Sequence, residues 1–148
     1  MSIQEICDLI DGFRDKSTGK GASPREIMEA EASLAVMFPA SYKQFLERYG
    51  WVRIEYDEFY GVGESAPVHL NLLTNTIAER TVMGPPMPNS LVPFLGDGFG
   101  NHYCLDTEKM IAGECPVVFW DHDLGASQQT RCEANSFAAW MAEYLAAK

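Results

Sequence analysis

The spacing of the hydrophobic residues changes twice along this chain. Apolar side chains recur every three or four residues in residues 2–49 and again in residues 137–145, which predicts amphipathic helices at both ends. Between them, short runs rich in β-branched and aromatic residues alternate with turn formers, which predicts consecutive strands. Helices that enclose a run of strands are typical of an α+β domain with a central, mainly antiparallel sheet.

Three helices are expected in the first third of the chain. The first covers residues 2–14, and residues 16–22, rich in turn formers, are expected to form a mobile surface loop. The second begins at Ser23, where Pro24 and Glu26 suit a first turn closed by a capping box, and its buried side should extend to Met37. The third follows Pro39, ends at Gly50, and carries one apolar face made of Tyr42, Phe45, Leu46 and Tyr49.

The strands are expected in the middle of the chain. Residues 51–56 and 59–62 form the first pair, with Asp57 and Glu58 as the turn between them. A helical pattern from Leu70 to about Met83 follows, and strands resume at residues 91–95, 101–106 and 116–120, the first two joined by the glycine-rich turn 96–101. The final helix should begin at Asn135 or Ser136 and pack on the sheet.

Length and composition indicate one domain that spans residues 1–148. Hydrophobic residues make up 47% of the sequence and charged residues 22%, an ordinary balance for a folded domain. No segment approaches the roughly 20 consecutive apolar residues that cross a bilayer. The first residues lack the basic and apolar regions of a secretory signal, so we expect a cytoplasmic protein that does not bind membranes.

The negative charge of the chain is concentrated in two windows. The formal net charge is −10, from 11 basic and 21 acidic residues. Residues 51–64 hold four acidic side chains and one arginine, and residues 97–123 hold six acidic side chains and one lysine. Such a field repels nucleic-acid phosphates and favours a basic partner, although acidity that only keeps a domain soluble is also common.

Metal and cofactor sites find little support in the sequence. The four cysteines lie far apart and are expected to be reduced, partly buried thiols. On a strand, Asp121 and Asp123 would share one side and His122 would face the other, which disfavours a site built from these neighbours. The sequence therefore predicts no metal and no cofactor.

One enzymatic alternative involves Cys104 and His102. These residues are two apart on a predicted strand, so they share a face and could form a nucleophile and base pair of a small hydrolase. No oxyanion-binding signature accompanies the pair, and a half-buried strand produces such pairs by chance. We therefore expect a protein without catalytic residues.

The order of these landmarks resembles the SUKH superfamily, the Smi/Knr type of domain. The matching segments are EASLAVMFPASYKQFL at residues 31–46 with YGW at 49–51, LVPFLGDGFGNHYCLD at 91–106, CPVVFWDHD at 115–123 and SFAAWM at 136–141. The resemblance implies an α+β domain that serves, mostly in bacteria, as an immunity protein against a polymorphic or contact-dependent toxin. Relatives that act as regulatory interaction modules make binding to a protein of the same cell the alternative.

The acidic residues at predicted turns are the candidate docking surface for a basic toxin or other basic protein. Charged side chains that gather at one rim around aromatic residues can steer and hold a partner, although each one taken singly could be ordinary solvated surface. Trp51 could serve as an aromatic anchor or belong to the core. The predicted partner-binding residues are Asp57, Glu58, Glu64, Asp97, Asp121, Asp123, Tyr56, Tyr60 and Phe99.

Overall fold

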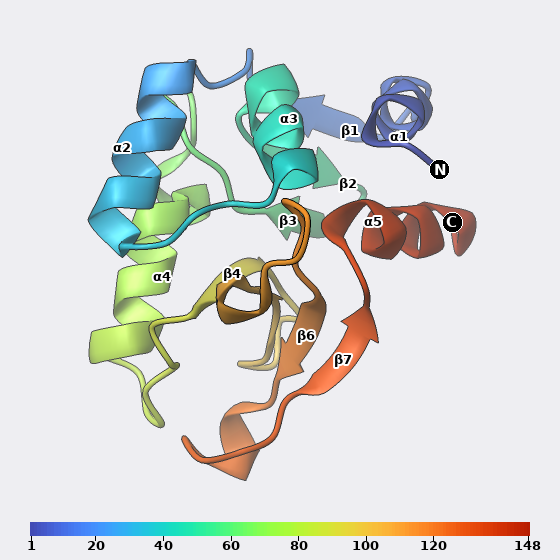
Figure 1. Cartoon of the computed structure of the whole chain (residues 1–148). Helices are drawn as coiled ribbons and strands as arrows, with labels where there is room; N and C mark the ends of the chain where they lie inside the picture. The colour runs from blue at the N-terminus through green and yellow to red at the C-terminus, as the bar shows by residue number, and fades with distance from the viewer.

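The computed structural model describes residues 1–148 and confirms a single α+β domain in which an antiparallel sheet is flanked by helices (Figure 1). The helices are α1 (Ile3–Asp11), α2 (Pro24–Leu34), α3 (Ala40–Tyr49), α4 (Leu72–Thr81) and α5 (Phe137–Ala146). The strands are β1 (Lys16–Thr18), β2 (Val52–Ile54), β3 (Asp57–Phe59), β4 (Leu91–Gly96), β5 (His102–Asp106), β6 (Val117–Trp120) and β7 (Arg131–Ala134). Three short 3₁₀ helices complete the chain: η1 (Val68–Leu70), η2 (Thr107–Lys109) and η3 (His122–Leu124).

The sheet is an antiparallel meander, as predicted. Its seven strands lie in the order of the sequence, from β1 at one edge to β7 at the other. The connection between β3 and β4 contains η1 and α4, which packs beside α2 at one side of the molecule (Figure 1). None of the helices combines the length and the apolar character that a membrane span requires.

Serine residues cap the N-termini of three helices: Ser2 at α1, Ser23 at α2 and Ser136 at α5. Ser23 accepts a hydrogen bond from the Glu26 amide at 3.1 Å, and the Glu26 carboxylate accepts one from the Ser23 amide at 2.9 Å, which confirms the predicted capping box. Ser136, rather than Asn135, caps α5 by accepting from Ala139 at 3.0 Å.

Two strands of the sheet were missed by the sequence prediction. The segment expected to be a mobile loop contains β1, in which Lys16, Ser17 and Thr18 pair with β2. Strand β7 was not predicted at all, because its sequence Arg-Cys-Glu-Ala contains no β-branched or aromatic residue. Both are edge strands of three or four residues, and pairing with a neighbouring strand defines them.

The ends of three helices and the position of one turn also differ from the prediction; α1, expected to cover residues 2–14, ends at Asp11. Helix α2 ends at Leu34 because Ala35 adopts a left-handed conformation with φ 56°, and Met37 is consequently 67% exposed instead of buried. The predicted helix from Leu70 to about Met83 is confirmed as a shorter α4. The turn between β2 and β3 lies at Glu55 and Tyr56, two residues earlier than expected.

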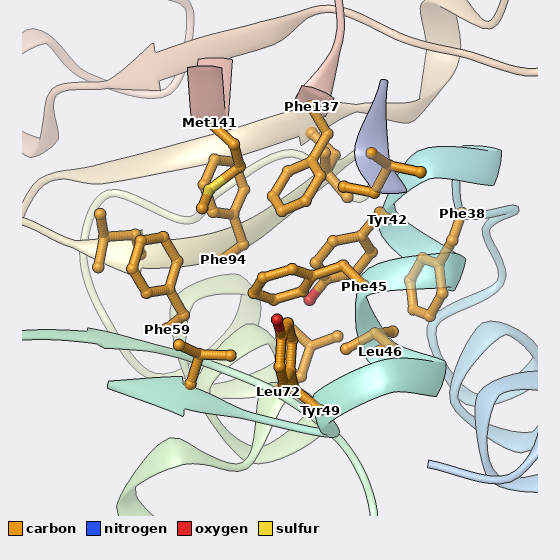
Figure 2. Close-up of a cluster of buried hydrophobic side chains, with 14 of the residues drawn as sticks. Phe38, Tyr42, Phe45, Leu46, Tyr49, Phe59, Leu72, Phe94, Phe137 and Met141 are labelled. Carbon is orange, nitrogen blue, oxygen red and sulfur yellow. The ribbon is translucent and has the colours of Figure 1, made fainter. Parts of the chain in front are cut away.

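The main core lies between the sheet and helices α1, α2, α3 and α5 and is dominated by aromatic rings (Figure 2). Phe45 is fully buried, and its ring centroid lies 5.1 Å from that of Phe137 and 5.6 Å from that of Tyr49. A smaller cluster occupies the opposite face of the sheet, since Cys104 belongs to it while Leu105 belongs to the main core. The members of this second cluster are Met87, Leu91, Cys104, Val118 and Trp120.

Candidate functional site

A cleft of about 400 Å³ opens where the β2–β3 turn, η1 and the β4–β5 turn meet. We call it the docking cleft. Five of the nine predicted partner-binding residues contribute to its lining, although they lie up to 41 positions apart in the sequence, from residue 56 to residue 97. The lining residues are Tyr56, Asp57, Glu58, Tyr60, His69, Leu70, Gly96, Asp97 and Gly98.

Two aromatic side chains at the cleft project into solvent. Tyr56 occupies the β2–β3 turn and is 99% exposed, because the preceding Glu55 turns the chain with φ 53°. Phe99, on the β4–β5 turn, is 81% exposed. Large apolar side chains held in water by short turns are typical anchors of a protein interface. Trp51, the third candidate anchor, is instead half-buried against Gly19.

The acidic residues of the cleft differ in how far the fold already uses them. Asp57 accepts hydrogen bonds from the Tyr144 hydroxyl at 2.6 Å and from Lys148 Nζ at 3.2 Å, so it fastens the C-terminal helix to β3. Glu58 contacts the exposed His69 ring at 2.8 Å. Of the two carboxylates, Glu58 is therefore the one more available to a partner.

Asp97 holds the glycine-rich turn in shape. Its carboxylate accepts hydrogen bonds from the backbone amides of Phe99 and Asn101 and from the Asn101 side chain, at 2.8 to 3.1 Å. Burial acts to raise the pKa of Asp97, but these hydrogen bonds outweigh it and the pKa is lowered. Asp97 thus positions Phe99 as well as contributing charge to the cleft.

Asp121 and Asp123 flank His122, which contacts the same turn. Asn101 Oδ1 lies 2.7 Å from His122 Nδ1 and accepts the His122 backbone amide at 3.1 Å, which links η3 to the β4–β5 turn. The expectation that His122 faces away from the two carboxylates was wrong. The chain leaves strand geometry after Trp120, and the short η3 turn brings ligand atoms of Asp121, His122 and Asp123 within 4.8 Å of one another.

These three side chains could each offer one ligand to a metal ion. The hydrogen bonds of two of them have a structural role: Asp121 caps η3 by accepting the Asp123 amide at 2.9 Å, and His122 anchors η3 to Asn101. Phe99, Asp121 and Asp123 are outside the lining of the docking cleft, and the remaining predicted residue, Glu64, lies elsewhere. Its amide donates to Glu26 at 3.1 Å, beside the first turn of α2, and it does not line the docking cleft.

Beneath the docking cleft lies a chain of polar contacts that the sequence did not reveal. Tyr60 OH is 3.3 Å from His102 Nε2, and His102 Nδ1 is 3.7 Å from Glu79 Oε1 on α4. Burial raises the pKa of Tyr60 to about 12, lowers that of His102 and raises that of Glu79. All three shifts favour the neutral forms, and His102 Nδ1 has no hydrogen-bond partner, so Glu79 and His102 are close neighbours across α4 and the sheet instead of a bonded pair.

The geometry does not support a Cys104 nucleophile with a His102 base. The two residues do share a face of β5, but the Cys104 thiol is directed at the His102 backbone carbonyl, 3.8 Å away, instead of the imidazole. Cys104 is fully buried, and burial raises the pKa of its thiol well above its ordinary value. Because the thiolate is the nucleophile, this sulfur is poorly placed for catalysis.

Thiol labelling of the native protein should distinguish the four cysteines. We expect Cys132, on the edge strand β7, to react rapidly with a disulfide reagent, because it is the one exposed thiol. Cys7, Cys104 and Cys115 are buried, and burial raises the pKa of each, to about 12 for Cys115. Rapid loss of a second thiol in a Cys132→Ser variant, without unfolding, would contradict this assignment.

The overall arrangement is shared with a solved bacterial protein. A protein from Pseudomonas syringae pv. tomato, known from a crystal structure, superposes with a TM-score of 0.67 over 95% of each chain, at 18% sequence identity. At this identity the likeness shows a common fold.

The family is shown by the sequence. Residues 5–146 match the family model SUKH_5, described as SMI1-KNR4 cell-wall, and this chain belongs to that family. The match confirms the suspected SUKH relationship and extends it into helix α1, beyond the segments that carried the resemblance.

Proposed function

We propose that this protein is an immunity-type binding protein that neutralises a cognate toxin by covering it, and that the toxin presents a basic surface to the docking cleft. The observation that carries the proposal is the cleft itself, where the exposed Tyr56 lies with Glu58 and Asp97 in the lining and the exposed Phe99 follows Gly98 on the same turn. Exposed aromatic side chains among like charges fit a protein partner of opposite charge. Domains of this family generally act by binding, which agrees with the inaccessible Cys104.

Electrostatic steering gives the first test. Charge reversal at Glu58 and Asp123 together should lower the association rate with the toxin about tenfold or more at low ionic strength, and less at high salt, since salt screens exposed charges. Both side chains are exposed, and neither supports a buried contact. Stopped-flow measurement of association at several salt concentrations provides the comparison.

A matched control uses two acidic residues on other elements. Charge reversal at Asp8 of α1 and Glu29 of α2 changes the net charge by the same amount, and neither residue lines the docking cleft. Equal effects of the two pairs would reject the proposed position of the interface. An association rate that does not depend on salt would reject electrostatic steering altogether.

The identity of the partner is tested by co-expression. A toxin encoded directly beside this chain should be neutralised by the wild-type protein and much less by a Tyr56→Ala, Phe99→Ala double variant. Both rings are at least 81% exposed, so their removal should leave the thermal midpoint nearly unchanged. Recovery of a self protein instead of a toxin from the native host would favour the regulatory interaction module.

A further inference from the structure

A second cleft, of about 460 Å³, lies at the opposite end of the β4–β5 hairpin. The docking cleft includes Gly96, which pairs with His102, whereas the second cleft includes Leu91, which pairs with Asp106 at the other end of the ladder. The segment before β4, η2 and the loop before β7 border it. Its size lies within the roughly 300–1,000 Å³ range of pockets that hold small molecules or single side chains with their backbone.

The carboxylate of Asp106 in this cleft has little compensation for its burial. Asp106 is 5% exposed, and burial raises its pKa. The nearest cation is Lys109 Nζ at 3.8 Å, a long contact from a side chain that is itself 68% exposed, and the Glu108 backbone offers a hydrogen bond. A buried carboxylate without a close cation costs folding free energy. The Asp106 carboxylate is therefore suited to pair with a cation supplied by a bound ligand.

The indole of Trp120 supplies a second, independent observation. Trp120 is 1% exposed and lines the same cleft, yet its Nε1–H has no acceptor within the protein. Buried indole N–H groups are nearly always paired, because an unmade hydrogen bond costs the full desolvation of the donor. The cleft therefore combines an acceptor whose nearest cation is distant and exposed with a donor that lacks an acceptor.

We propose that this second cleft binds an arginine side chain of an extended peptide segment, with the guanidinium on the Asp106 carboxylate and a peptide carbonyl accepting from Trp120 Nε1. An arginine residue in a peptide carries both groups, the guanidinium as the cation and the backbone carbonyl as the neutral acceptor. Arginine fits better than lysine, because its planar guanidinium is weakly hydrated and can donate two parallel hydrogen bonds to one carboxylate. On binding, the guanidinium displaces Lys109, whose contact with Asp106 is long and exposed to solvent.

The test uses a minimal probe and the Trp120 indole resonance. N-acetyl-arginine N-methylamide is titrated into the full-length protein, and the indole N–H signal of Trp120, assigned with a Trp120→Phe variant, is followed by NMR. We expect a saturable shift. The neutral isostere N-acetyl-citrulline N-methylamide should give at least about tenfold weaker binding, because it lacks the charge-assisted hydrogen bonds.

Variants on the two sides of the ion pair should move the affinity in opposite directions. Asp106→Asn should weaken the arginine probe about tenfold or more, whereas Lys109→Gln should strengthen it about two- to threefold by removing a competing cation. Asp8→Asn, a matched loss of charge on α1 outside both clefts, should have no effect. Equal binding of the citrulline probe, no shift of the Trp120 signal, or weaker binding by Lys109→Gln would each overturn the proposal.

Stability measurements show whether the Asp106→Asn variant is a fair test. Because burial raises the pKa of Asp106 in the folded state, the ionised carboxylate destabilises the fold above the unfolded pKa near 3.8. The asparagine variant should therefore have a higher thermal midpoint than the wild type at pH 7, and the gain should disappear towards pH 4. These measurements need no toxin, so their failure would leave the proposed function of the docking cleft untouched.

Discussion

Replacement of Phe45 by alanine should remove about 3 to 5 kcal/mol from the free energy of unfolding, a large share of the roughly 5 to 15 kcal/mol typical of a domain. The Phe45 ring is fully buried at the centre of the core that Figure 2 shows. It contacts rings from α3, β3 and α5, at centroid distances of 5.1 Å to Phe137 and 6.2 Å to Phe59. Its removal leaves a cavity. The surrounding side chains belong to three different elements, so they cannot all move inward to fill it.

The same substitution at Phe99 is the control for this prediction. Phe99 is 81% exposed, so its replacement by alanine should change stability by no more than about 0.5 kcal/mol. Urea unfolding followed by tryptophan fluorescence measures both variants on the same scale. A Phe45→Ala variant with nearly wild-type stability would show that this ring does not hold the helices on the sheet.

Replacement of Gly61 by alanine should have an effect of similar size, for a different reason. A Cβ atom on Gly61 would lie 1.7 Å from the carbonyl oxygen of Gly50 and 2.8 Å from Cα of Trp51. The clashing atoms belong to the backbone, so no side chain can rotate away, and the end of α3 must separate from the chain after β3. We expect a loss of about 3 kcal/mol or more, at the upper end of overpacking substitutions.

Gly61 also supports the docking cleft. Its amide donates to Leu70 at 2.9 Å and its carbonyl accepts from Leu72 at 2.8 Å, which holds η1 and the start of α4 beside β3. Tyr60 and Leu70 line the cleft. The Gly61→Ala variant should therefore bind the toxin poorly even at temperatures where it remains folded, and amide hydrogen exchange should report faster exchange in η1.

A second glycine-to-alanine substitution controls for backbone entropy. Gly12 follows α1 with an ordinary helical φ of −80°, and a Cβ atom there would meet its nearest neighbour, the Leu9 carbonyl oxygen, at 3.4 Å. Alanine at this position should leave stability unchanged or raise it slightly, since it restricts the unfolded chain. Similar losses in the two variants would refute the steric explanation for Gly61.

The docking cleft and the second cleft differ in how far the sequence predicts them. Residues 97–101 gather glycines, an aspartate and an exposed phenylalanine within one turn, so this half of the docking cleft was visible in the sequence. The β2–β3 half was predicted only approximately, because the turn was placed at Asp57 and Glu58 instead of Glu55 and Tyr56. The second cleft could not be predicted, since neither the cation deficit of Asp106 nor the missing acceptor of Trp120 is a property of local sequence.

The sequence by itself determined the approximate positions of the helices, the capping box of α2 and many apolar residues of the core. Ser23 with Glu26, and the face that carries Tyr42 and Phe45, are encoded within a few neighbouring residues, because helical hydrogen bonds and 3.6-residue spacing are local. Only the tertiary structure decided the edge strands and the meeting of distant acidic residues. A strand of three or four residues acquires its hydrogen bonds from a neighbour that the chain reaches only after folding, and the same folding brings Tyr56 and Glu58 into one cleft with Asp97.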